Sequence, residues 1–271
     1  MAISQRIRLE YSGPMAVITL DYPQKLNSMT KDDFYQLASY LTQIAERDDI
    51  LITLLIGKGK YFSAGADISV SRVQPPGTDL YRHGLAFTVA SNLNLARAFY
   101  THPKILISAL NGPVVGMPAA LVAHSDFIYA VPNTFLLTPF ASLGLIPEGV
   151  SSLAFTQRMG ITKAKEALIT GKRLSSKELL DSGFINQVFD CRPGDDVTFK
   201  KLVFEEIQKL FHPDLDTTSM LKTKELISRR MREQFDAQNV EEVFGALSRS
   251  VAGIPQKQFE KRRLQMANSK L

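Results

Sequence analysis

Two short segments, residues 51–56 and 105–110, are almost continuously apolar, and they constrain the fold more than any other feature of the chain. A strand with one face in water alternates apolar and polar residues, whereas a strand buried on both faces does not. We therefore expect two interior strands of a sheet covered on both sides. Strand-like and helix-like segments alternate through the first 190 residues, which predicts an α/β core with right-handed crossovers.

The remaining segments predict the order of the elements. Residues 7–11 and 15–20 form a hairpin pattern around a Ser-Gly-Pro turn, and Thr30 can cap a helix with Asp32 and Asp33 in its first turn. We expect further helices at 80–100, 116–124, 148–159, 162–170 and 176–182, and further strands at 127–131, 135–137 and 184–189. From residue 196 onward the pattern predicts helices alone. We therefore divide the chain into a core, residues 1–195, and a helical C-terminal region, residues 196–271.

Composition narrows the kinds of site that we expect. The single cysteine, Cys191, leaves no internal disulfide and no cysteine-based zinc site, and the four histidines do not form an H-E-x-x-H pattern. We therefore expect no metal and no separate cofactor. The net charge of +5 is compatible with nucleic acid, an anionic membrane or a phosphorylated small molecule. No apolar run reaches the ~18 residues of a membrane span, so we expect none.

The last three residues are Ser269, Lys270 and Leu271. A free C-terminal S-K-L is an address read by the peroxisomal import receptor. The simpler interpretation is a polar end of the last helix. We favour the address and expect import into the peroxisomal matrix.

Three segments are candidates for chemistry, although each taken alone is more simply a turn. The first, G-K-Y-F-S-A-G-A-D-I at 59–68, has small residues that let a ligand approach the backbone. The second, N-G-P-V-V-G-M-P-A-A at 111–120, has Pro118 suited to a first helical position, so we expect Met117 at the N-cap, beside the positive end of the helix dipole. The third, L-G-L-I-P-E-G-V-S-S at 143–152, places Glu148 where we expect a helix to start.

Together, and in this order, the three segments resemble the crotonase, or enoyl-CoA hydratase/isomerase, superfamily. The resemblance covers roughly residues 7–189, with a looser helical tail. It implies a crotonase-like ββα superhelix whose helical C-terminal region is used in assembly, so we expect a homotrimer or homohexamer. It also implies that the core binds an acyl-CoA thioester. Alternation alone would also have allowed a doubly wound sheet.

The resemblance implies an oxyanion hole made of two backbone N–H groups, which fall by position on Ala66 and Met117. Such donors would hold the thioester oxygen, where charge gathers as the α-proton leaves. Two glutamates of the family's hydratases would align with Ala120 and Phe140, and neither position carries an acid. The chain therefore looks poorly equipped for standard hydration.

Glu148 offers a different reaction. Its segment resembles that of the fungal peroxisomal Δ3,Δ2-enoyl-CoA isomerases, in which one glutamate moves a proton from C2 to C4. We expect Glu148 to be this base, with Leu143, Leu145 and Ile146 supplying apolar burial that would raise its pKa. The expected function is conversion of 3-enoyl-CoA to trans-2-enoyl-CoA in β-oxidation of unsaturated fatty acids.

The resemblance also implies the residues that contact the substrate and its CoA portion. Lys25 and Leu26 belong to a segment expected beside the adenine. Lys261 belongs to a basic cluster on the final helix, for which the alternative interpretation is a solvent-exposed helix face. The expected contact residues are Lys25, Leu26, Ser63, Ala64, Gly65, Asp67, Ile68, Gly116, Phe140, Leu143 and Lys261.

Four other functions stay open. A dienoyl-CoA isomerase uses an acid at the position of Glu148, usually aspartate, together with a second acid expected near Phe140, and an atypical enoyl-CoA hydratase could serve a specialised peroxisomal pathway. Outside catalysis, the family includes acyl-CoA-binding and RNA-binding relatives. No RRM, KH or zinc-finger pattern is present, so we expect no nucleic acid.

Overall fold

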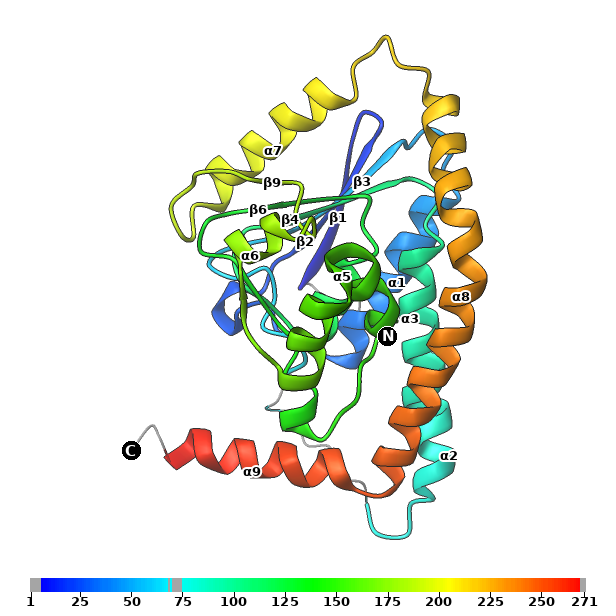
Figure 1. Ribbon diagram of the computed structural model, residues 1–271, viewed down its shortest axis with the longest axis vertical. Coiled ribbons are helices and arrows are strands. Elements are labelled where there is room, and N and C mark those ends of the chain that lie inside the picture. Colours follow the sequence, from blue (N-terminus) through cyan, green and yellow to red (C-terminus); the bar gives the residue numbers. More distant parts are fainter. Residues whose placement is uncertain (1–5, 68, 70–74, 269–271) are drawn as a thin grey trace.

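The computed structural model describes residues 6–67, 69 and 75–268 (Figure 1). Within these residues, a six-stranded sheet has the order β1-β2-β3-β4-β6-β9. Its first pair is an antiparallel hairpin and the remaining pairs are parallel, as the predicted α/β core requires. The strands are β1 (Ile7–Ser12), β2 (Met15–Leu20), β3 (Ile52–Gly57), β4 (Ile105–Leu110), β6 (Phe127–Ala130) and β9 (Gln187–Val188). A smaller sheet joins β5 (Val114–Val115), β7 (Phe135–Leu137) and β8 (Leu174–Ser175).

The two apolar segments form the middle of the sheet, and every residue of β3 and β4 is buried. Their side chains alternate between two cores. Leu55 and Leu106 face the core that includes α1 (Lys31–Ala45), whereas Leu54 and Ile107 face the core beneath α7 (Asp196–Leu210). The prediction of burial on both faces is therefore confirmed.

The long helix expected at 80–100 forms with one irregularity. It consists of α2 (Leu80–Gly84), a π-helical segment η2 (Leu85–Val89) and α3 (Ala90–Tyr100). Single π-turns inside α-helices are frequent at functional sites. As predicted, Thr30 caps α1, and it does so in a capping box with Asp33.

Three predicted boundaries were wrong. Gly116, with φ of 68°, is the N-cap of α4 (Met117–Val122), so Met117 is the first helical residue and not the cap. Glu148 does not start a helix, because Gly149 and Val150 are both left-handed and α5 (Ser151–Thr170) begins after them. The last strand is shorter than predicted, since the N–H groups of Phe184 and Ile185 bond back to α6 (Ser176–Asp181).

Helices alone follow α7 in the described part of the C-terminal region, as predicted. α8 (Thr217–Val251) runs along the molecule beside α3, and α9 (Ile254–Asn268) crosses its end and contacts η3 (Ala141–Leu143) (Figure 1). The remaining short helix is η1 (Pro23–Lys25). In the described ranges, no helix combines the length and apolar character needed to cross a membrane.

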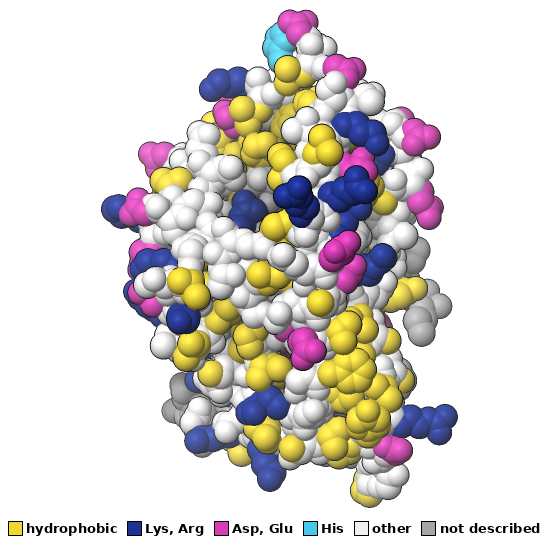
Figure 2. Space-filling model, turned by 45° about the vertical axis from the view of Figure 1, so that its right-hand side comes forward, with side chains coloured by type: hydrophobic (Ala, Val, Ile, Leu, Met, Phe, Trp, Pro, Cys, Tyr) yellow, Lys and Arg dark blue, Asp and Glu magenta, His cyan; other side chains and the backbone are white. Residues whose placement is uncertain are grey.

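The face that carries α8 is divided by side-chain type. Figure 2 shows basic side chains concentrated on its upper half and hydrophobic ones on its lower half. The C-terminal half of α8 contributes Val240, Phe244 and Val251, which are exposed although apolar. Contiguous exposed apolar surface of this kind marks association sites in soluble proteins.

Candidate active site

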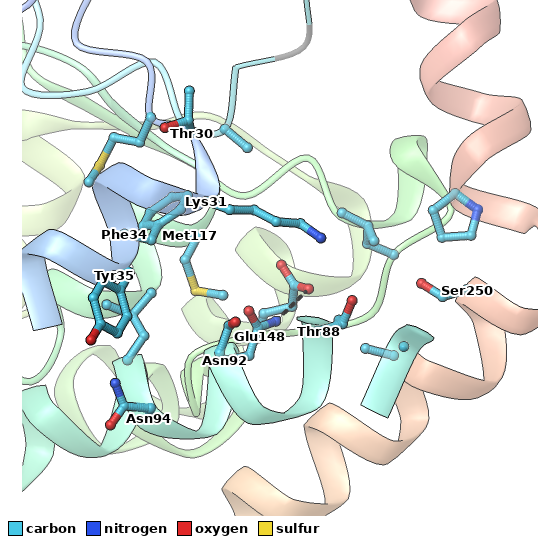
Figure 3. A pocket seen from close by; sticks show the side chains of 18 of the residues that line it. Thr30, Lys31, Phe34, Tyr35, Thr88, Asn92, Asn94, Met117, Glu148 and Ser250 are labelled. Carbon is cyan, nitrogen blue, oxygen red and sulfur yellow. Dashed lines mark hydrogen bonds between the residues drawn. The ribbon is translucent and has the colours of Figure 1, made fainter. Parts of the chain in front are cut away.

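A cavity of about 510 Å³ lies between α1, the loop after β3, the α2–α3 helix, α4, and the ends of α8 and α9. Its size is typical of a small-molecule site. Most of its surface is formed by apolar atoms, although polar and apolar residues both line it, and Lys31 extends across it (Figure 3). Its lining includes Ala66 and Asp67 from the first candidate segment, Met117 from the second, Glu148 from the third, and Asn92 from α3.

The first two candidate segments lie side by side. Ser63 accepts the N–H of Val115 at its carbonyl and donates its own N–H to Pro113, at 2.9 and 3.3 Å. Gly65 then passes so close to the second segment that a Cβ there would lie 2.9 Å from the carbonyl oxygen of Val115. Since Gly65 has φ of 90°, glycine is required both for this conformation and for this approach.

Beside this packing, two backbone N–H groups lack a protein acceptor within the described residues. The flanking peptides of Ala66 pair with Met29, while its own N–H has no acceptor among the described residues. The N–H of Met117 lies in the first turn of α4, where the helix offers no acceptor. Ala66 and Met117 both line the cavity, so the two residues whose N–H groups lack a protein acceptor border the same space.

Buried polar side chains hold the first segment in shape. The Ser63 hydroxyl is fully buried; it donates to the carbonyl of Asn27 at 2.7 Å and accepts the N–H of Gly65 at 3.2 Å. Asn27 in turn donates to the carbonyls of Lys58 and Tyr61. Ser63 therefore positions the loop through hydrogen bonds to its backbone. Asn27 was missed in the sequence, where a left-handed asparagine has no distinct signal.

Glu148 lies on the loop between η3 and α5, partly exposed within the cavity. Its Oε1 accepts a hydrogen bond from Nδ2 of Asn92 at 3.3 Å (Figure 3). The next residue, Gly149, packs against α4: a Cβ there would lie 3.1 Å from Sδ of Met117 and from Cβ of Ala120. Glu148 is therefore one residue from direct contact with the helix that supplies the second N–H donor.

Of the apolar neighbours expected around Glu148, Leu145 lines the cavity and packs against the main core. Ile146 points the other way, and its Cδ1 would lie 2.5 Å from a Cβ at Gly245 of α8. The remaining cavity carboxylates among the described residues belong to Asp32 and Asp67. Hydrogen bonds from Ser69 hold the pKa of Asp67 below its usual value, so this group is ionised at neutral pH.

The other predicted contact residues surround the cavity or lie away from it. Leu26 accepts the N–H of Ala64 at 2.8 Å, and Lys25 before it is exposed. Phe140 is 2% exposed and belongs to the main core. The structure places Gly116 behind Gly65, Leu143 in the partly exposed η3 turn, and Lys261 on the exposed face of α9. Ile68 lies outside the described residues.

A family model described as enoyl-CoA hydratase/isomerase matches residues 10–261. The chain belongs to the enoyl-CoA hydratase/isomerase family. Within this family it is 46% identical over 265 residues to the Delta(3,5)-Delta(2,4)-dienoyl-CoA isomerase of Pyricularia oryzae, with 93% of this chain and 94% of that protein covered. It is 32% identical over 263 residues to the 3,2-trans-enoyl-CoA isomerase of Saccharomyces cerevisiae, covering 94% and 93%.

Solved structures show the same fold. A Pseudomonas aeruginosa protein, OdaA, matches with a TM-score of 0.82 and 24% identity over 95% of this chain and 98% of that one. An enoyl-CoA hydratase/isomerase from Pseudoalteromonas atlantica matches with a TM-score of 0.81 and 22% identity, over 97% and 98%. The crotonase-like fold expected from the sequence is therefore confirmed.

Proposed function

We propose that this chain isomerises 3-enoyl-CoA thioesters to trans-2-enoyl-CoA, with Glu148 as the base and the N–H groups of Ala66 and Met117 as the oxyanion hole. The observation that carries the proposal is the shared cavity: the Glu148 carboxylate and both donors line it, and Gly149 packs directly on Met117. A base and a pair of preorganised donors in one apolar cavity are the two elements that enolate chemistry needs.

The reaction is a proton transfer within one substrate. Glu148 takes a proton from C2, and the electrons of that C–H bond move into the C2–C1 bond, leaving negative charge on the thioester oxygen. The two N–H groups stabilise this charge, which is larger in the transition state than in the bound substrate. The protonated Glu148 then delivers the same proton to C4 as the double bond shifts to C2–C3. No atom is gained or lost, and no second acid is required.

The other cavity carboxylates in the described part of the chain support a single-acid route. Asp67 stays ionised, because Ser69 stabilises its charged form, and a carboxylate without a proton is a poor general acid. Asp32 lies in the first turn of α1 and is exposed to solvent. Glu148 is thus the carboxyl group best placed both to take and to return the proton.

A second candidate is isomerisation of 3,5-dienoyl-CoA to 2,4-dienoyl-CoA, which is favoured by the 46% identity to the Pyricularia oryzae enzyme of that name. It begins with the same removal of the C2 proton but ends with protonation at C6, two carbons beyond C4. A single carboxylate must then reach farther along the chain, which is why we place this reaction second.

The test measures purified protein against 3-hexenoyl-CoA and a 3,5-dienoyl-CoA, by the absorbance of the conjugated thioester formed. We expect turnover of the 3-enoyl substrate and a loss of about 10²- to 10⁴-fold in kcat for Glu148→Gln, the range of general acid–base contributions. Faster turnover of the dienoyl substrate would assign the second candidate. An inactive wild type that still binds acyl-CoA, or a fully active Glu148→Gln, would contradict the proposed mechanism.

The cellular setting is part of the same proposal. We propose a homotrimer or homohexamer, supported by the exposed apolar side chains of α8, and contact of CoA with Lys25 and Lys261, which are both exposed. The proposed peroxisomal location rests on Ser269, Lys270 and Leu271, which lie outside the described residues. Imaging of an N-terminally tagged chain with and without Leu271 tests the location.

A further inference from the structure

The loop that carries Glu148 is held at both ends by one face of α8. At its start, Nε of Arg249 donates to the carbonyl of Gly144 at 2.6 Å. At its end, the carboxylate of Glu242 accepts the N–H of Val150 at 2.7 Å and the N–H of Ser152 at 3.0 Å. Glu242 and Arg249 are about two helical turns apart, so they lie on the same side of α8.

Between these contacts the backbone of α8 lies directly against the loop. Gly245 has no side chain, and a Cβ there would lie 2.5 Å from Cδ1 of Ile146. Ala246 and Ser250, from the same face, line the cavity with Glu148. One stretch of α8 therefore contacts the beginning, the middle and the end of the loop.

Glu242 replaces the capping side chain that α5 lacks. The N-cap of α5 is Val150, whose side chain cannot accept a hydrogen bond. The Oε1 atom of Glu242 also accepts the hydroxyl of Ser152 at 2.5 Å, so three donors converge on one carboxylate. Glu242 is 4% exposed. Burial raises its pKa, and the three hydrogen bonds oppose this by stabilising the charged form.

The backbone that Glu242 holds is strained. Val150 has φ of 61°, a left-handed conformation that a β-branched residue rarely adopts. Such a conformation persists where surrounding contacts over-determine it. Here the Gly149–Val150 peptide is bound on both sides, because Nε2 of His124 donates to the carbonyl of Gly149 at 2.8 Å while Glu242 receives the N–H of Val150. This peptide begins one residue after Glu148.

We propose that Glu242 is a positioning residue for the reaction: by binding Val150 and Ser152 from α8, it fixes the turn that aims the Glu148 carboxylate at the substrate, with Arg249 fixing the other end of the loop. The inference rests on the proposed role of Glu148 as the base. Glu242 itself is directed at the backbone of α5 and is absent from the described residues that line the cavity.

The variant that tests this is Glu242→Gln. An amide has one oxygen in place of two, so its NH₂ group would face an N–H of the turn, and the loop would lose part of its hold. A small displacement of a reacting group costs up to about 10²-fold, so we expect kcat to fall by about 10- to 100-fold. KM should change little, since binding depends on the cavity walls and the two N–H donors.

The matched control is Glu241→Gln, the same substitution at the neighbouring exposed position of α8. It should keep the wild-type kcat. Hydrogen exchange of the Val150 N–H supplies a readout independent of turnover: it should accelerate in Glu242→Gln and remain slow in Glu241→Gln. Binding of hexanoyl-CoA, which has no double bond to move, should be the same in all three proteins.

Several outcomes decide the matter. A Glu242→Gln protein with wild-type kcat would overturn the inference, even if Glu148→Gln is inactive, and so would unchanged exchange at Val150. A wild-type protein that is inactive on both 3-hexenoyl-CoA and the 3,5-dienoyl-CoA would instead contradict the proposed function. If Glu242→Gln does not fold, Arg249→Met tests the other end of the loop, where we expect a loss of about tenfold in kcat. Wild-type kcat in that variant would again overturn the inference.

Discussion

The side-chain amide of Asn92 donates to the carboxylate of Glu148 across 3.3 Å, although 56 residues separate the two in sequence. This hydrogen bond joins α3 to the loop before α5 inside the cavity. Figure 3 shows the Asn92 side chain reaching Glu148 from α3, whereas α8 contacts the backbone of the loop that carries Glu148. Glu148 therefore has a side-chain partner on α3 in addition to the support that α8 gives to its loop.

Replacing that partner by an acid of the same shape should change how activity depends on pH. In Asn92→Asp the donor becomes a second carboxylate beside Glu148, and two like charges so close do not both ionise readily. We expect the acidic limb of the kcat profile to move to higher pH, with kcat reduced at pH 7 and partly recovered at pH 9. Steady-state kinetics of both proteins from pH 5 to 9 measures this shift. Superimposable profiles would show that Asn92 does not influence the base.

The close approach of Gly65 to Val115 should be essential for activity. Gly65→Ala places a Cβ 2.9 Å from the Val115 carbonyl oxygen and must push the two segments apart, displacing the Ala66 N–H from that of Met117. Loss of one oxyanion donor costs about 10²- to 10³-fold in kcat, and we expect a loss in this range.

Gly77→Ala is the matched control for this change. Gly77 has φ of 83°, close to that of Gly65, but a Cβ there would meet nothing within 4 Å. It therefore reproduces the backbone strain without the collision. Equal kcat losses in the two variants would attribute the effect to strain and not to the oxyanion hole.

Buried histidines should make the protein less stable in acid. Burial lowers the pKa of His102 to about 3, whereas an unfolded histidine titrates near 6.5. Between pH 6.5 and pH 3, His102 is therefore protonated in the unfolded chain and neutral in the folded chain. The stability contributed by neutral His102 is complete above pH 6.5 and is lost as pH falls toward 3. His124, with a pKa lowered to about 4 by burial, acts in the same direction.

Removal of one titrating group should flatten this dependence. In His102→Gln the free energy of unfolding should fall less steeply between pH 6 and pH 4.5, by about 1.4 kcal/mol per pH unit for the one group removed. Urea unfolding at four pH values compares the slopes of variant and wild type. Parallel slopes would mean that His102 titrates normally in the folded protein.

Much of the fold could be predicted because its signals are local. The apolar runs of β3 and β4 and the capping box at Thr30 depend on residues a few positions apart. The boundary at Glu148 was wrong because it depends on Val150, a residue type that normally disfavours the left-handed conformation found there. Nothing in the sequence near Val150 indicates that this residue adopts a left-handed conformation.

The supporting residues of the site were missed for a related reason. Asn92 and Glu242 act across 56 and 92 residues, and each looks like an ordinary polar position of a helix. One signal was present for Asn92: Ser91, Asn92 and Asn94 are poor helix formers placed close together in a helix that is otherwise mostly apolar. The roles proposed for Ala66, Met117 and Glu148 came from the family resemblance, which orders the three segments along the chain.

The contact between Glu242 and the turn at Val150 has a consequence for how such a protein can change over evolutionary time. The carboxylate and the backbone that needs it stand 92 residues apart, on opposite sides of the boundary drawn at residue 195. A substitution in the turn that alters its donors is therefore tolerated only with a compensating change in α8, and the two segments should co-vary among relatives. Exchange of the C-terminal helices between two such enzymes would replace residue 242 but leave the turn at residue 150 unchanged. A chimera joined at that boundary should fold its sheet yet lose turnover until residue 242 is matched to its new turn.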